Sequence, residues 1–472
     1  MPKQEANVAE RTVSRRRFLA RAAAAGAVAA MPLPHIRAQR YAAAERLNVA
    51  LVGVSGRGGW FVEAIPRIGE NVVALCDVND QRAADAFEKI PQAKRFRDFR
   101  RMFDAMADTI DAVVVAVPDH NHAVIANTAI VLGKHVYCEK PLTHHVHEAR
   151  HLRANVRKYG VATQMGNQGT ATHAFREGVE IVQSGMLGAV REVYIWKDSG
   201  GPGPVPIPTG EQPVPEFLDW DVWLGPAAER PFHEKWLKWH TWRDFGTGNL
   251  GNWGSHSTNM AFMALQVDRL WEADAFPRAD RRVIKVVAEV DARTQTSFPR
   301  WERVRWFVPA RGDLPPVVFD WFNGSRAPGR REHVESILGR RLDWGDAGER
   351  RWADHGGCVI RGEKGLLKAT AHNSEYVLLP EDRFAGATLP KPYLPRSGSH
   401  EREWTAACKG GPTPMSHFDY AGRLIEFLML GNVATLFPEI ELEYDPVEGT
   451  IRNHPPADAA LHREYRRGWS LA

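Results

Sequence analysis

The turn VGVSGRGG at residues 52–59, between an apolar run and an amphipathic stretch, constrains the fold of this chain most strongly. It fits the pattern G-x-G-x-x-G at the first and last glycines, Gly53 and Gly58, with Ser55 in the middle followed by Gly56. Glycines at these positions permit a tight turn and let the backbone approach a pyrophosphate at the N-terminus of the next helix. The order of strand, glycine loop and helix therefore predicts a dinucleotide-binding fold.

An acidic residue follows at the spacing typical of this fold. Asp77 lies near the end of the next apolar run, 19 residues after Gly58. A carboxylate there accepts hydrogen bonds from ribose hydroxyls and repels a 2′-phosphate. This pattern favours NAD over NADP as the cofactor.

Strand-like and helix-like stretches alternate through the first third of the chain. Short β-branched runs lie at 47–52, 71–78, 111–117, 135–140 and 161–165, and helical stretches at 59–69, 95–107, 122–132 and 145–159. This alternation predicts an α/β fold whose parallel, doubly wound sheet is covered on both faces.

The first 40 residues are typical of a targeting segment. SRRRFL at 14–19 precedes a short run rich in alanine, and a twin-arginine pair in this setting indicates export of an already folded protein. The run is too short and too rich in alanine and glycine for a transmembrane helix. A disordered basic tail is the alternative. We expect residues 1–40 to be signal and linker, and the mature protein to be periplasmic or otherwise extracytoplasmic without a membrane span.

The same segment accounts for the positive net charge of the chain. The full sequence carries a formal charge of +4, but outside residues 1–38 acidic residues outnumber basic ones by one. The mature composition therefore gives no support for nucleic acid as a partner. The four cysteines form no zinc or C-x-x-C pattern and require no disulfide: Cys76, Cys138, Cys358 and Cys408.

A histidine-rich stretch at 143–151 is the one place where a metal site could be considered. His144, His147 and His151 would share one face of the predicted helix. That spacing suits a metal, but a solvated helix face is the favoured interpretation, so we predict no metal site.

The segment AVPDHNHAVIANTAIVLGKHVYCEKPLT at 116–143 resembles the Gfo/Idh/MocA oxidoreductases, the glucose–fructose oxidoreductase and inositol dehydrogenase family. The resemblance rests on V-P-D-H-x-H after a strand and on G-K-H-V-x-C-E-K-P. It continues through 164–169, 184–196, 219–226, 243–256 and 424–434.

The resemblance implies an NAD-binding Rossmann domain over 45–168 and a substrate and oligomerisation domain over 169–450. The second domain would be α/β, with an open, mainly antiparallel sheet that covers the nicotinamide. Late helices would pack back on the first domain, and 451–472 would form a tail. Strand-like runs with partial alternation agree with a one-faced sheet: 190–196, 283–291, 301–308, 316–322 and 365–371. The Pro/Gly-rich stretch 200–215 predicts a long loop that serves as a lid or arm or is mobile.

Lys140 of E-K-P is the first catalytic candidate. It follows a strand end, where it would hydrogen-bond the reacting hydroxyl and stabilise an alkoxide or relay a proton. Glu139 and Pro141 would fix the turn, and the resemblance implies a cis peptide before Pro141.

His256, in LGNWGSHSTN, is the second catalytic candidate, because it corresponds to the family histidine that polarises or deprotonates the substrate hydroxyl. Many members carry an aspartate four residues earlier, where this chain has Asn252. An amide does not stabilise imidazolium as a carboxylate does, so we expect a lower pKa for His256 and weaker proton transfer. Asp244 is the nearest carboxylate upstream and could replace the missing acid.

The other candidates support these two. We expect cofactor contacts from Gly53, Ser55, Gly56, Arg57, Gly58, Asp77, Pro118, Asp119, His122, Glu139, Lys140 and Asn167, with a helix cap as the alternative role of His122. We expect substrate contacts from Lys140, Asn167, Trp196, Arg243, Asn252 and His256, and Lys197 and His173 are further substrate-side candidates.

Export and an NAD cofactor together constrain the function. Free NAD is scarce outside the cytoplasm, so a protein exported in its folded state would carry tightly bound NAD. We predict an oxidoreductase that acts on a sugar, cyclitol or glycoside hydroxyl as a homodimer or homotetramer. One alternative is an NAD-dependent glycoside hydrolase or lyase that works by transient oxidation and elimination. Another is a non-catalytic sugar or NAD binder. Net NADH formation, release of free sugar, or neither of these would distinguish the three.

Overall fold

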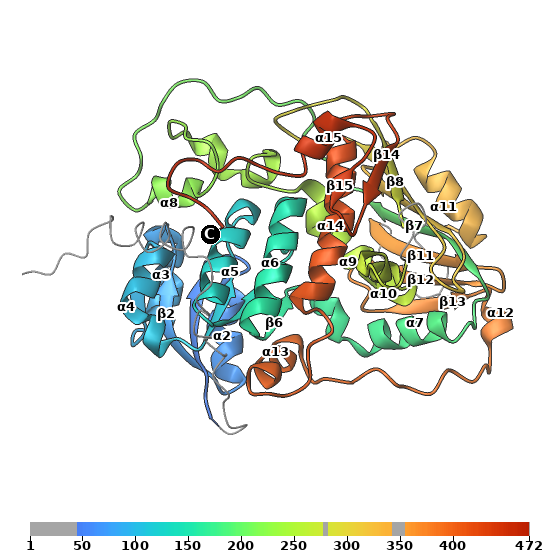
Figure 1. Ribbon diagram of the computed structural model, residues 1–472, viewed down its shortest axis with the longest axis horizontal. Coiled ribbons are helices and arrows are strands. Elements are labelled where there is room, and N and C mark those ends of the chain that lie inside the picture. Colours follow the sequence, from blue (N-terminus) through green and yellow to red (C-terminus); the bar gives the residue numbers. More distant parts are fainter. Residues whose placement is uncertain (1–44, 277–281, 342–354, 472) are drawn as a thin grey trace, which may run out of the picture. The chain divides into compact units, whose positions relative to one another are not determined.

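The computed structural model describes residues 45–276, 282–341 and 355–471, so the predicted twin-arginine segment lies outside the described residues. The first domain contains a six-stranded parallel sheet with the order β3-β2-β1-β4-β5-β6 (Figure 1). This is the doubly wound order of dinucleotide-binding folds, so the predicted architecture is confirmed. The strands are β1 (Asn48–Val52), β2 (Asn71–Cys76), β3 (Lys94–Phe96), β4 (Ala112–Val115), β5 (His135–Cys138) and β6 (Thr163–Met165).

Helices cover both faces of this sheet, which explains why its central strands are continuous apolar runs. In β4, Val113 and Val115 pack into one hydrophobic cluster and Ala112 and Val114 into another on the opposite face. The helices of this domain are α2 (Gly59–Arg67), α3 (Asp80–Lys89), α4 (Phe99–Met106), α5 (His122–Val131) and α6 (Val146–Tyr159).

Two elements of this domain differ from the prediction. The helix predicted over 95–107 is instead the edge strand β3 followed by α4, whose N-cap Asp98 accepts a hydrogen bond from Arg100 N. Helix α3 was not predicted, although Asn79 caps it in the same way. The sequence of β3, KRF, carries two charges in three residues, so it has no apolar pattern by which a strand is recognised.

The second domain is built on a nine-stranded sheet with the order β13-β12-β11-β7-β10-β9-β8-β14-β15. Neighbouring strands are antiparallel except for β7 and β10, so the predicted open, mainly antiparallel sheet is confirmed. The predicted runs correspond to β7 (Val190–Lys197), β8 (Ile284–Val290), β9 (Glu302–Val308), β10 (Val317–Asn323) and β12 (Leu366–Thr370). The strands that were not predicted are β11 (Gly356–Gly362), β13 (Tyr376–Leu379), β14 (Leu442–Asp445) and β15 (Thr450–Ile451).

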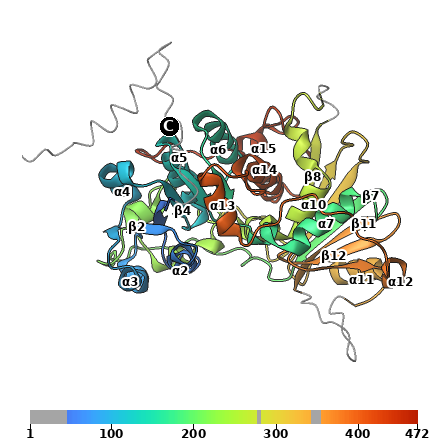
Figure 2. The ribbon, with the colours of Figure 1, turned by 90° about the horizontal axis from the view of Figure 1, so that it is seen from below.

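Helix α14 (Phe418–Ala434) lies between α6 of the first domain and the second sheet (Figures 1 and 2). Its Phe427 stacks on Trp306 of β9 with ring centroids 4.8 Å apart. On the other face of the sheet, α11 (Arg330–Leu338) contributes Val334 to a smaller cluster that contains Tyr194 of β7.

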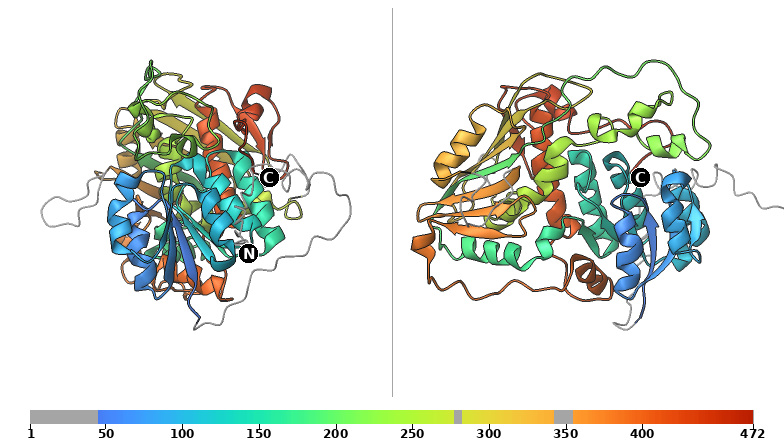
Figure 3. Two further views of the ribbon diagram at one scale, coloured as in Figure 1. Left: turned by 90° about the vertical axis from the view of Figure 1, so that its left-hand side faces the viewer. Right: turned by 180° about the vertical axis from the view of Figure 1, so that it is seen from behind.

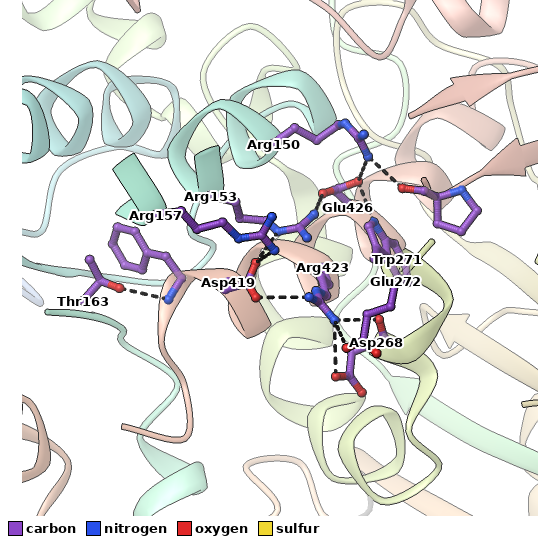
Figure 4. Close-up of polar contacts among 12 residues, drawn as sticks. Arg150, Arg153, Arg157, Thr163, Asp268, Trp271, Glu272, Asp419, Arg423 and Glu426 are labelled. Atoms are coloured by element: carbon purple, nitrogen blue, oxygen red, sulfur yellow. Dashed lines mark hydrogen bonds and ion pairs between the residues drawn. The ribbon is translucent and has the colours of Figure 1, made fainter. Parts of the chain in front are cut away.

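The buried carboxylate of Glu426 on α14 connects three parts of the chain (Figure 4). It accepts hydrogen bonds from Arg150 at 3.1 Å and Arg153 at 2.7 Å on α6, and from Trp271 and Tyr444, each at 2.8 Å. A buried carboxylate needs such a complete set of donors, because removing one partner leaves an uncompensated charge.

A long excursion at 198–249 leaves the second sheet after β7 and reaches the first domain (Figure 3). It contains the short elements α8 (Trp220–Leu224), η4 (Glu234–Leu237) and η5 (Trp239–Thr241), and many of the chain's tryptophans. The chain then enters η6 (Leu250–Gly254) and α9 (Ser255–Ser257), which carry the LGNWGSHSTN segment. Across the described ranges, no helix is both long and apolar enough to cross a membrane.

Candidate active site

A cleft of about 490 Å³ runs along the carboxyl ends of strands β1, β2, β4 and β5. Its volume is that of an ordinary small-molecule site. Most of the predicted cofactor residues line it together with Asn252: Gly53, Ser55, Gly56, Arg57, Asp77, Pro118, Asp119, His122, Glu139 and Lys140.

The glycine loop forms a backbone cradle at the N-terminus of α2. Gly53 has φ +80°, and a Cβ atom there would lie 2.2 Å from the carbonyl oxygen of Ala116. A Cβ atom on Gly58 would lie 2.0 Å from the carbonyl oxygen of Gly53. Both positions therefore exclude side chains, and the open backbone beside a helix N-terminus fits a pyrophosphate.

Asp77 is fixed beside this loop by two backbone donors. Its Oδ2 accepts from Val54 N and its Oδ1 from Asn79 N, both at 3.0 Å. Burial raises the pKa of this carboxyl, whereas the two backbone hydrogen bonds lower it. The carboxylate lines the cleft in a fixed orientation, as ribose recognition requires.

Lys140 contacts the second domain directly. Its Nζ donates to the backbone oxygen of Asn252 at 3.2 Å and to the side-chain oxygen of the same residue. The Lys140–Pro141 peptide is cis, as the resemblance implied. Burial lowers the pKa of the Lys140 ammonium, while the charges of Glu139 and Asp119 raise it. The amide at position 252 therefore acts on Lys140 as a hydrogen-bond acceptor.

Glu139 links the glycine loop to the E-K-P turn. It accepts from Arg57 Nε at 2.7 Å and from Gln168 Nε2 at 3.0 Å. Burial raises the pKa of Glu139, and the neighbouring Arg57 and Lys140 oppose this shift. Arg57 thus contributes to the site by holding Glu139.

Asp119 is a buried acid close to Lys140. Its Oδ2 accepts from Thr247 N at 3.0 Å and from Thr247 Oγ1 at 2.6 Å. Burial raises the pKa of Asp119 to about 7, although Thr247 and Lys140 stabilise its charge. The site therefore contains a carboxylate near Lys140 even though position 252 is an amide.

His256 is buried on α9, and its Nδ1 has no hydrogen-bond partner among the described residues. Burial, followed by the nearby Lys140 and His372, lowers the pKa of His256 well below its usual value. Its ring lies 4.7 Å from that of His372 and 6.4 Å from that of Trp253, between centroids. A neutral imidazole in this position can accept a proton from a substrate hydroxyl.

His372 and Lys197 extend this group from the second sheet. His372 is exposed in the turn between β12 and β13, and Lys197 Nζ lies 4.4 Å from the centre of the Trp253 ring. Sequence reasoning missed His372, since only the packing of this turn against the 250–259 segment brings it to the site. Lys197 is a predicted substrate-side residue that the structure does bring here.

Three predicted residues lie elsewhere. Asp244 forms an ion pair with Arg230, and no contact joins it to His256, so it does not replace the missing acid. Trp196 is fully buried on the α11 side of the sheet, because side chains alternate along β7 and only its neighbour Lys197 faces the site. His173 is exposed on α7 (His173–Gln183), near Glu177 and away from these groups.

Arg243 is the fourth such residue, and its side chain forms hydrogen bonds within the second domain. Its Nε donates to the carbonyl oxygens of Thr294 at 3.1 Å and Ser297 at 2.7 Å, and its Nη2 to Thr435 Oγ1 at 2.9 Å. The substrate role predicted for Arg243 is therefore replaced by a structural one.

Asn167 and His122 form hydrogen bonds to segments that carry the site residues. Asn167 donates to Ser255 O at 3.4 Å, next to His256, and accepts from Ser416 Oγ at 2.5 Å. The ring nitrogens of His122 contact Val117 O at 2.8 Å and Pro141 O at 2.7 Å, so the ring connects β4 to the E-K-P turn. His122 is the first residue of α5, and no side chain caps that helix.

The remaining predictions concern metals and thiols. Helix α6 begins at Val146, so His144 precedes it and does not share a face with His147 and His151. In the part of the chain that the structure describes, no group of three or more metal-ligating side chains comes together. The four cysteines are free and buried.

Comparison with known proteins identifies the family. Residues 47–167 match a family model described as "Oxidoreductase family, NAD-binding Rossmann fold", and residues 175–303 match the C-terminal alpha/beta domain of the same family. These two stretches make up more than half of the chain. The chain belongs to the Gfo/Idh/MocA oxidoreductase family. Its first domain is accordingly an NAD-binding Rossmann domain.

Individual relatives match over shorter stretches. The chain is 39% identical over 98 residues to inositol 2-dehydrogenase of Corynebacterium glutamicum, covering 20% of this chain and 28% of that protein. It is 35% identical over 108 residues to a glycosyl hydrolase family 109 protein of Streptomyces niveus, covering 20% and 21%. The chain thus spans less than a third of the length of either relative. The WlbA dehydrogenase of Bordetella pertussis, solved with NADH and UDP-GlcNAcA, shares the fold at a TM-score of 0.54, with 14% identity over 84% of this chain and 98% of that one.

Proposed function

We propose that this protein is an exported NAD-dependent oxidoreductase that acts on a sugar, cyclitol or glycoside hydroxyl and keeps its NAD tightly bound. The contact of Lys140 Nζ with Asn252 carries the proposal, because it joins the E-K-P turn of the NAD cleft to the segment that bears His256. The similarity to an inositol dehydrogenase supports a polyhydroxylated substrate.

Each group along the cleft has a distinct role. NAD supplies the hydride acceptor when it is bound. The glycine loop and Asp77 hold the dinucleotide, and Lys140 donates a hydrogen bond to the substrate hydroxyl oxygen. Neutral His256 accepts the hydroxyl proton as the C–H bond breaks. Glu139 and Asp119 balance the charge of Lys140.

Export and cofactor retention form one hypothesis. The SRRRFL segment supports export of a folded protein, and such a protein would leave the cytoplasm with NAD already bound. If the site retains its cofactor, a second carbonyl substrate that binds there would have to accept the hydride and so restore NAD. The open sheet of the second domain supports a homodimer or homotetramer. Residues 1–40 fused to a folded reporter should direct its export, and replacement of Arg15 and Arg16 by lysine should abolish it.

An NAD-dependent glycoside hydrolase or lyase is the second candidate, supported by the match to a glycosyl hydrolase family 109 protein and by the amide at position 252. In that reaction, oxidation at a ring carbon acidifies the neighbouring C–H bond. Elimination would then release the leaving group as an alcohol and leave an unsaturated ketone. In a hydrolase, water would add to this double bond, and hydride return to the ring carbonyl would restore NAD; a lyase would omit the addition of water.

One experiment separates these activities. Purified protein is analysed for bound NAD(H) by mass spectrometry and then incubated with sugars, cyclitols and glycosides while NADH and free sugar are recorded. Net NADH identifies a dehydrogenase, and free sugar without net NADH identifies a glycosidase. Lys140→Met should abolish either activity. Absence of net NADH, of free sugar and of any paired oxidised and reduced sugar products, with NAD still bound, would leave a binding protein and contradict the proposal.

A further inference from the structure

The tryptophan-rich segment 217–246, here called the cover, forms one wall of the NAD cleft. It lies over the first domain, beyond the arching loop that leaves the second domain after β7 (Figure 3). Six of its side chains line the cleft opposite the strand ends: Leu218, Val222, Trp223, Leu237, Trp239 and His240. A bound dinucleotide would therefore lie between the Rossmann loops and the cover.

The cover is attached to the first domain beside Asp77, where the adenosine ribose would bind. Asp219 N donates to Val78 O at 2.8 Å, and Asp80 N donates to Phe217 O at 2.9 Å. Asn79 and Leu218 form an isolated antiparallel bridge between these bonds. The chain thus adds a short strand-like contact directly after β2.

A second attachment lies after β4, toward the nicotinamide end. Trp223 O contacts His120 Nε2 at 2.8 Å and accepts from Asn121 Nδ2 at 2.9 Å, and Phe245 O accepts from His120 N at 3.2 Å. Burial, followed by the charge of Lys140, lowers the pKa of His240 to about 4, and both residues line the cleft. The cover therefore extends along the cleft from the ribose end to the reacting end.

The cover has a hydrophobic core of its own. Trp220 and Trp223 stack with centroids 4.9 Å apart, and Trp236 and Trp242 lie 4.8 Å apart. On its outer side, Arg466 donates to Gly225 O at 2.6 Å and pairs with Asp221 at 2.7 Å. Segments with a core of their own and attachments on several sides open as cooperative units.

We propose that the cover controls cofactor exchange, with Leu237 and Trp239 contacting bound NAD directly and preventing its release between turnovers. Both side chains are half-buried and line the cleft. Trp239 offers a large, rigid apolar surface beside the cofactor. This inference rests on the proposed NAD-dependent function, and it makes the cover the part of the protein that slows the release of NAD.

The test measures the exchange of NAD in the intact protein. NAD-loaded protein is mixed with an excess of isotope-labelled NAD, and the bound fraction is followed by native mass spectrometry. Trp239→Ala and Leu237→Ala should each exchange at least about tenfold faster than the wild type, since changes at a binding surface act mainly on the dissociation rate. Ile207→Ala is the matched control, because Ile207 belongs to the same excursion but is exposed and does not line the cleft.

Arg466→Ala tests whether the attachment of the cover slows NAD release, in addition to direct contacts between its side chains and NAD. Arg466 does not line the cleft, so faster exchange in this variant must come from loosening the cover. Thermal melting of each variant shows whether it remains folded. Equal exchange rates in the wild type, Trp239→Ala, Leu237→Ala and Arg466→Ala would overturn the inference. A wild-type protein that binds no NAD would instead refute the proposed function itself.

Discussion

The contact between Lys140 and Asn252 predicts that two substitutions at position 252 shift the pH dependence of the reaction in opposite directions. Asn252→Asp puts a carboxylate where an amide now accepts from the Lys140 ammonium, so the pKa of Lys140 should rise. Asn252→Ala removes that acceptor and should lower it. Lys140 donates as an ammonium, so its deprotonation sets the alkaline limb of the pH-rate profile. This limb should therefore move to higher pH in the Asp variant and to lower pH in the Ala variant.

The magnitudes follow from the geometry. The side-chain oxygen of residue 252 is in hydrogen-bond contact with Lys140 Nζ, and at a separation of about 3 Å two unit charges attract by about 5 kcal/mol at an effective dielectric constant of about 20. Desolvation of the new carboxylate offsets part of this energy, so the pKa of Lys140 should rise by about 1 to 3 units in the Asp variant. Loss of one hydrogen bond to a charged group, about 1.5 to 3 kcal/mol, gives a fall of about 1 to 2 pH units in the Ala variant.

The assay is the pH profile of hydride transfer in a single turnover, followed by nicotinamide absorbance in NAD-loaded protein. Single turnover isolates the chemical step from cofactor exchange. Shifts in the same direction in both variants, or none in either, would refute the assignment of Asn252 to Lys140. Movement of an acid limb instead would mean that position 252 acts on His256.

Three further substitutions test other parts of the site. Asp77→Asn keeps an acceptor for Val54 N but removes the charge, so NAD should bind about tenfold more weakly and NADP should gain relative to it; an unchanged ratio of the two affinities in fluorescence titrations would contradict this. His372→Ala should lower kcat/KM about tenfold without changing the melting temperature, because His372 is exposed beside His256; wild-type kinetics would remove it from the site. Arg243→Ala leaves two carbonyl oxygens without their donor and should lower the free energy of unfolding by about 2 to 4 kcal/mol in urea titrations, with NAD affinity retained; a loss of turnover at unchanged stability would restore the substrate role.

The features that sequence reasoning recovered are those encoded by local chemistry. The strand, glycine loop and acid at 48–77 act within one β-α-β unit, and both glycine positions prove sterically closed to a side chain. The strands of the first sheet that are buried on both faces carry unbroken apolar runs, so they were predictable. The edge strand β3 was not, because its side chains are polar and only its pairing with β2 makes it a strand.

The errors at the site have a common cause, which is that proximity in sequence does not set proximity in space. Asp244 is a near carboxylate along the chain, but it pairs with Arg230. Trp196 occupies the correct strand but points to the wrong face, and its face depends on the register of β7. His372 lies more than 100 residues after His256 and reaches it only through the packing of a hairpin turn.

The buried carboxylate of Glu426 has a consequence for how the protein unfolds. Its partners come from α6 in the first domain and from Trp271 and Tyr444 in the second. If either domain lost its structure, a buried charge in the other would be left without its partner. The two domains should therefore melt in a single cooperative transition. A fragment that ends after β6 would keep Arg150 and Arg153 without their shared acid, and it should not fold to a stable NAD-binding unit.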